Sequence, residues 1–105
     1  MITKLLDGAT ATHTGTPLHL PGDRTIIKVP QTVQATVAGS GSVSATVIVE
    51  FSNDLVGWIP GFTIPLSGTD IASNGDLNNN PWSYARARLT EISGIQAAVT
   101  VSVGV

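Results

Sequence analysis

In two stretches of this chain every second residue is apolar and the residues between are, except for Ile48, polar or small. This period of two limits the possible folds more than any other feature. In residues 43–51 every odd-numbered position is apolar, as it is in residues 97–105. Because successive side chains of a strand point to opposite faces, both stretches are predicted to be central strands that bury their odd-numbered side chains together. No stretch places apolar residues at helical spacing over three turns.

Further strands are predicted from the same periodicity. One covers residues 32–38, and short ones cover 17–20 and 25–29, separated by a turn at 21–24. A strand over 58–66 contains Pro60 and Pro65, which lack the backbone N–H of a sheet ladder and therefore indicate an edge, a strand end or a bulge. In a strand over 82–90, one face carries Trp82, Tyr84, Arg86 and Arg88, and the other carries Ser83, Ala85, Ala87 and Leu89.

Segments rich in Gly, Ser, Asn and Asp separate these strands, at residues 38–42, 52–54, 67–70, 74–81 and 92–94. The first is predicted to join 32–38 and 43–51 as a hairpin, and Ser93-Gly94 to join the strand ending near Thr90 to the last one. Short antiparallel strands without helices predict an all-β fold, a single antiparallel β-sandwich or jelly roll over residues 17–105. Residues 1–16 are expected to form an N-terminal arm or an edge strand.

The composition limits the partners that such a domain can bind. Only 11% of the 105 residues are charged, the net charge is −2, and the five Lys and Arg residues are scattered along the chain, so a nucleic-acid surface is not expected. The absence of cysteine excludes disulfides, thiolate chemistry and Cys-based zinc sites. No run approaches the roughly 18 apolar residues of a membrane span, so we expect a soluble protein without a membrane partner.

No group of residues predicts catalysis. His13 and His19 flank a segment with Gly and Pro but have no spaced carboxylate partner, and most Asp residues lie in predicted turns, where they bond their own backbone. The segment 76–80 lacks the alternating ligands, central Gly and terminal Glu of a calcium loop. We therefore expect no enzyme, no catalytic residue, no metal and no cofactor.

The aromatic residues allow two interpretations. Trp58 and Trp82 could form a sugar-stacking platform, but the favoured interpretation is that they start strands and cover the ends of the core. Arg86 and Arg88, on the same face as Tyr84, are expected either to lie along an apolar layer with their charged heads in water or to stack on Trp82.

The first eight residues contain large apolar side chains on a segment that otherwise offers only small ones. If exposed, these side chains would form a patch that soluble monomers usually cover with a partner. The partner-binding residues predicted from this argument are Ile2, Lys4, Leu5 and Leu6. Deletion of residues 2–8 is then expected to leave the isolated fold intact.

Two stretches resemble a known class of proteins. The first is Val47-Ile48-Val49-Glu50-Phe51-Ser52-Asn53-Asp54-Leu55-Val56-Gly57-Trp58, and the second runs from Pro81-Trp82-Ser83-Tyr84 through Ser93-Gly94 to the final alternating strand. From about Val43 to the C-terminus they resemble small β-sandwich structural proteins of tailed bacteriophages, including head decoration (cement) proteins. The Ser-Asn-Asp turn followed by Trp is also similar to discoidin-like, sugar-binding jelly rolls, although Leu55 stands where such turns usually carry Gly.

The resemblance implies a capsid decoration protein that binds the assembled, expanded phage head and stabilises it. It implies the major capsid protein as a partner, while the apolar side chains of the N-terminal segment predict further copies of the chain, in a dimer or trimer, as partners. It also implies a place on the capsid surface of the virion after synthesis in the host cytoplasm, and it implies no catalytic residues. The alternatives are a carbohydrate-binding tail or adhesion module and a tail or neck structural component. Burial of both Trp58 and Trp82 would exclude a sugar platform, whereas exposure of both side by side would weaken the decoration role.

Overall fold

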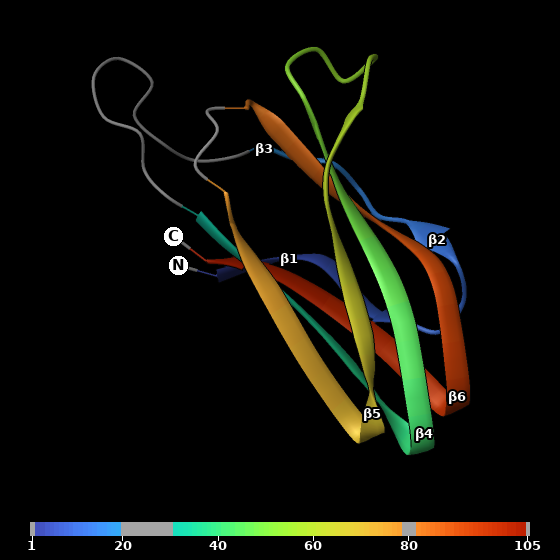
Figure 1. Cartoon of the computed structure of the whole chain (residues 1–105). Coiled ribbons are helices and arrows are strands. Elements are labelled where there is room, and N and C mark those ends of the chain that lie inside the picture. The colour runs from blue at the N-terminus through green and yellow to red at the C-terminus, as the bar shows by residue number, and fades with distance from the viewer. Residues whose placement is uncertain (1, 20–30, 79–81, 105) are drawn as a thin grey trace.

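The computed structural model describes residues 2–19, 31–78 and 82–104, in which every regular element is a β-strand. The predicted strand at 25–29, the turn at 21–24 and Val105 lie outside these residues. The strands form one antiparallel sheet with the order β1-β6-β4-β5, in which β2 and β3 also pair with β6 (Figure 1). They are β1 (Ile2–Ala9), β2 (His13–Thr14), β3 (Leu18–His19), β4 (Gln31–Ser52), β5 (Ile59–Asn78) and β6 (Tyr84–Gly104). The predicted all-β, sandwich-like fold is confirmed.

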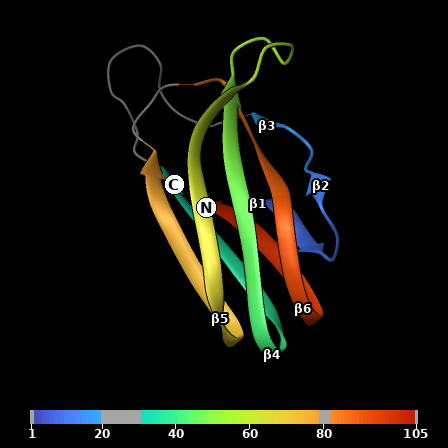
Figure 2. The ribbon, with the colours of Figure 1, turned by 45° about the vertical axis from the view of Figure 1, so that its right-hand side comes forward.

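The three long strands, of 22, 20 and 21 residues, each bend near their middle. Figures 1 and 2 show that the bends lie at the same end of the molecule, so that the sheet folds over on itself. We call the two halves layer 1 and layer 2. Layer 1 contains residues 43–52, 59–68 and 84–92 with β2 and β3, and layer 2 contains residues 31–38, 71–78 and 97–104 with β1.

The predicted hairpin between 32–38 and 43–51 is wrong, because both segments are halves of β4. This strand pairs with β5 on one side and with β6 on the other, in both layers. The Gly/Ser segment between its halves is a corner, where the register shifts and Gly41 has a φ of 74°. Ser93-Gly94 is likewise a corner within β6, and Asp70 lies at the corner of β5 with a φ of 63°. Corners and hairpin turns both use residues that tolerate positive φ, so the sequence signal is the same for both.

The predicted alternation is confirmed in both layers. All odd-numbered side chains of residues 33–37, 43–51, 85–89 and 97–103 are buried, together with Ile64 and Leu66 from β5. Because β4 and β6 bury odd positions on both sides of their corners, a single face of the folded sheet lines the core of both layers.

The predicted edge character of the strand with Pro60 and Pro65 is also confirmed, since among the described strands β5 pairs only with β4. The register shifts by one residue beside Pro60, which leaves Gly61 as the extra residue of a β-bulge. In layer 2 the side chain of Asn74 donates to the carbonyl of Pro65 in layer 1, with Nδ2 and O 3.1 Å apart. This bond ties the two layers together along the β5 edge.

The N-terminal segment forms the other edge strand, β1, along residues 99–104 of β6. Lys4 pairs with Ser102, whereas Leu6 pairs with Val101, so Leu5 is an extra residue in a β-bulge. The bulge allows two consecutive side chains to enter the core, where Leu5 and Leu6 are only 4% and 5% exposed. The alternatives of arm and edge strand for the first 16 residues are thus resolved for residues 2–9, which form a strand.

Candidate functional site

The residues predicted to bind a partner at the N-terminus lie in different environments. Leu5 and Leu6 belong to the core of their own chain, so they do not form the exposed apolar patch on which that prediction depended. Lys4 is exposed, and its Nζ lies 3.3 Å from Oδ1 of Asp7, which is also exposed. The side chain of Ile2 lies outside the described part of the structure.

The two tryptophans are half-buried and each contacts another side chain. The guanidinium carbon of Arg86 lies 4.2 Å from the centroid of the Trp58 ring, a cation–π contact. The ring of Trp82 stacks on that of Phe51 with centroids 6.4 Å apart, and it packs against the core. Arg86 therefore does stack on an indole, but on Trp58 rather than on Trp82 as predicted.

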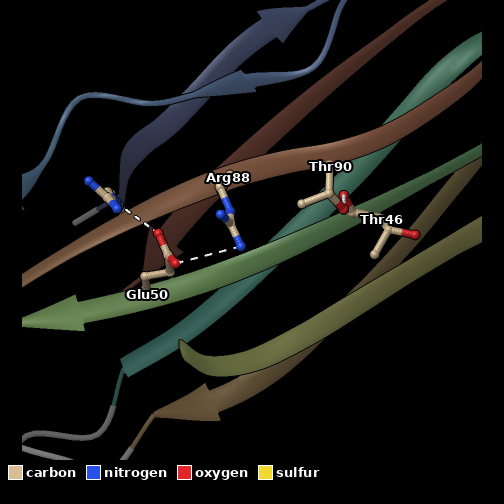
Figure 3. A network of polar contacts seen from close by, with 5 residues as sticks. Thr46, Glu50, Arg88 and Thr90 are labelled. Atoms are coloured by element: carbon tan, nitrogen blue, oxygen red, sulfur yellow. Dashed lines mark hydrogen bonds and ion pairs between the residues drawn. The ribbon is translucent and has the colours of Figure 1, made fainter. Parts of the chain in front are cut away.

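The carboxylate of Glu50 on β4 pairs with Arg86, and its side chain is only 8% exposed although its position on the strand faces away from the core (Figure 3). The Arg86 Nε donates to its Oε1 at 2.8 Å. Glu50 Oε2 lies 3.8 Å from Nη2 of Arg88, the next residue of β6 on the outer face. We call Glu50, Trp58, Arg86 and Arg88 the Glu50 cluster. The outward direction of Glu50 follows from the alternation of β4, whereas its partners depend on a pairing across 36 residues.

Within the loop between β4 and β5, backbone N–H groups donate to the side chains of Ser52 and Asp54. Ser52 Oγ accepts from the backbone N–H groups of Asp54 and Leu55 and donates to Asp54 Oδ1. That same Oδ1 accepts from the N–H groups of Val56 and Gly57, at 2.9 and 3.0 Å. The bonds from Val56 and Gly57, and then that from Ser52, hold the pKa of the Asp54 carboxyl below its ordinary value of 3.8. Leu55, with a φ of 66°, adopts the left-handed conformation for which related turns use Gly.

The outer face of layer 2 has a different character from the Glu50 cluster in layer 1. Here the even-numbered residues of β4 and β6 and the odd-numbered residues of β5 point outward. All of these residues are uncharged. We call this surface the neutral face. It comprises Thr32, Gln34, Thr36, Ala38, Ile71, Ser73, Gly75, Leu77, Ala98, Thr100, Ser102 and Gly104.

Two residues of the neutral face are large, apolar and exposed: Ile71 at 61% and Leu77 at 51%. Near its centre Thr36 Oγ1 and Ser73 Oγ lie 2.7 Å apart in a hydrogen bond, which fixes both side chains. The charged residues Lys4 and Asp7 lie beyond it, on the edge strand β1. The structure thus presents a neutral sheet surface three strands wide.

In residues 2–19, 31–78 and 82–104, no three His, Asp or Glu side chains gather as a possible metal site. The ring of His19 on β3 contacts that of Tyr84 edge-on, with centroids 5.2 Å apart. Nor do these residues include a helix with the length and hydropathy needed to span a membrane. Comparisons of the chain with protein-family models, with curated proteins and with solved structures find no match.

Proposed function

We propose that this chain is a structural protein that binds an assembled protein shell, as a head decoration or cement protein of a tailed bacteriophage does. The observation that carries the proposal is the neutral face. A partner that covers this face removes no ionised side chain of β4, β5 or β6 from water, so it avoids the largest cost of forming an interface. Burial of Ile71 and Leu77 contributes favourably, at about 25 cal/mol for each Å² of apolar surface.

Such a protein would act by mass action. A domain that binds the expanded shell, and not its earlier form, stabilises the shell by the free energy of binding, summed over many equivalent sites. A small and uncharged footprint suits this role, because each copy needs only a modest affinity when the shell offers many sites.

The carbohydrate-binding alternative has less support. A sugar platform needs exposed aromatic rings, whereas Arg86 covers Trp58 and Trp82 stacks on Phe51. A tail or neck component would use the neutral face in the same way as a head protein, so only the identity of the bound assembly distinguishes these two roles.

The test is co-sedimentation of the purified chain with expanded and unexpanded heads of the phage whose genome carries its gene. We expect binding to expanded heads only. Gln34→Lys, which places a charge on the neutral face, should weaken binding by at least about tenfold, since a buried unpaired charge costs several kcal/mol. Thr63→Lys is the matched control on an exposed outward position of layer 1 and should bind normally. Wild-type protein that ignores heads and binds a glycan array would overturn the proposal.

A further inference from the structure

We propose that Arg88 and the hollow beside it form a binding site for a small oxyanion, a carboxylate or a phosphate group. The hollow has a volume of about 510 Å³ and is lined by Thr12, His13, Thr14, Arg88, Leu89 and Thr90. It lies where β2 runs along β6, because Thr14 pairs with Arg88 and His13 pairs with Leu89. On its other side, β6 pairs with β4, which carries Glu50.

The charges of the Glu50 cluster do not cancel. Two guanidinium groups, those of Arg86 and Arg88, face the single carboxylate of Glu50, and this leaves one positive charge in excess. Arg86 satisfies Glu50 with a hydrogen bond of 2.8 Å and is itself held over the ring of Trp58. The excess charge therefore belongs to Arg88.

Arg88 is also the less constrained of the two arginines. Its Nη2 lies 3.8 Å from Glu50 Oε2, which is beyond the roughly 3.2 Å limit of an N–H···O hydrogen bond (Figure 3). Its side chain is 44% exposed, compared with 25% for that of Arg86. The N–H donors of Arg88 are therefore available to a ligand, while the nearby carboxylate limits where the guanidinium can move.

The hollow supplies groups that suit the same ligand. The planar guanidinium presents paired N–H donors that match two oxygens of a carboxylate or a phosphate. Thr12 and Thr14 add hydroxyl donors, whereas the hydroxyl of Thr90 already donates to the carbonyl of Thr46 at 3.2 Å. None of the described residues that line the hollow is acidic, so a cation finds no counter-charge in its walls. The Glu50 carboxylate, 3.8 Å from Arg88 Nη2, is only 8% exposed and already accepts a hydrogen bond from Arg86.

The site is separate from the surface used in the proposed function. Arg88 and β2 belong to layer 1, and the neutral face belongs to layer 2. A failure of either proposal therefore leaves the other unaffected.

The test is a titration of the full chain with inorganic phosphate and with acetate, followed by ¹H–¹⁵N NMR at constant ionic strength with chloride as the balancing anion. We expect saturable shifts of the Arg88 Nε–H and of the Thr14 and Thr90 amides, with half-saturation on the order of 1–10 mM for so small a ligand. The tighter of the two ligands identifies the group as a phosphate or as a carboxylate.

Arg88→Gln should weaken binding by at least about tenfold, because it removes the charge and the paired donors. Arg88→Lys keeps the charge and should restore only part of the affinity. Lys4→Gln removes an exposed cation on β1 and should have no effect. Shifts that stay linear, that chloride alone reproduces, or that persist in Arg88→Gln with the same half-saturation would overturn the site.

Discussion

Glu50 and Arg86 lie directly opposite each other on β4 and β6, and the Arg86 Nε donates to the Glu50 Oε1 at 2.8 Å while its guanidinium covers Trp58. The pair joins two strands of layer 1 on the face turned away from the core. With a side chain only 8% exposed, Glu50 is sheltered from solvent to a degree that is unusual for a carboxylate on an outer face.

A double-mutant cycle measures the interaction free energy of the Glu50–Arg86 pair. Glu50→Gln, Arg86→Gln and the double variant are expected to give a coupling free energy of about 1–2 kcal/mol in chemical denaturation. This value is below that of a fully buried pair because the Arg86 side chain is 25% exposed. The control is the cycle on Lys4 and Asp7, whose side chains are 55% and 73% exposed. Its coupling should stay below about 0.5 kcal/mol, and equal couplings in the two cycles would contradict the argument.

Gly61 is expected to be intolerant of any side chain. A Cβ at this bulge position would overlap the ring of Phe51, which is 2% exposed and packed between Phe62 and Trp82. Gly61→Ala should lower the free energy of unfolding by about 1–3 kcal/mol, the usual cost of overpacking a core. Gly57→Ala is the matched control, since no atom of the described residues lies within 4 Å of its added Cβ. It should change stability by less than about 0.5 kcal/mol, and equal effects would show that the ring of Phe51 moves aside freely.

The first strand should prove necessary for stability. Leu6→Ala is expected to cost about 2–4 kcal/mol, because it leaves a cavity among buried side chains. Deletion of residues 2–8 should lower the melting temperature sharply or prevent folding, contrary to the expectation from sequence. Both effects are measured by thermal denaturation followed by circular dichroism. A truncated protein with unchanged melting temperature would show that β1 contributes nothing to the isolated fold.

Acid should loosen the loop between β4 and β5 before it affects the core. The backbone donors of Val56 and Gly57 favour the charged form of Asp54, so its pKa in the folded protein lies below the ordinary 3.8. The stabilisation is therefore complete above that ordinary value and is lost as the pH falls through the lower, folded-state pKa. A carboxyl ¹³C titration should give the Asp54 midpoint below 3.8. The stability difference between wild type and Asp54→Ala should shrink over the same pH range, and a midpoint at or above the ordinary value would refute this account.

The burial pattern could be predicted from the sequence because it depends only on parity. Val47, Val99 and Val101 are buried as predicted from their odd positions, and Pro60 and Pro65 lie on an edge strand, one of the places that their missing N–H groups indicated. These features follow from side-chain direction and backbone chemistry, which each residue carries with it.

Features that depend on a distant partner could not be predicted. Leu5 and Leu6 are both buried only because the register to β6 shifts between Lys4 and Leu6, and the sequence of β1 alone contains no sign of that shift. The Glu50–Arg86 pair and the Arg88 hollow likewise depend on how β6 aligns with β4 and β2. Gly41 and Asp70 marked places where the direction of the chain changes, but positive φ alone does not distinguish a reversal from a corner.

The corners also determine how this domain can come apart. β4, β5 and β6 each run through both layers, so the chain does not complete one layer before it enters the other. Unfolding of one layer would therefore disturb every long strand of the other layer. We expect a single cooperative unfolding transition, in which the changes in tryptophan fluorescence and in far-UV circular dichroism coincide. Folding should be slow for a chain of this length, on the order of milliseconds to seconds, since most pairings join residues far apart in sequence.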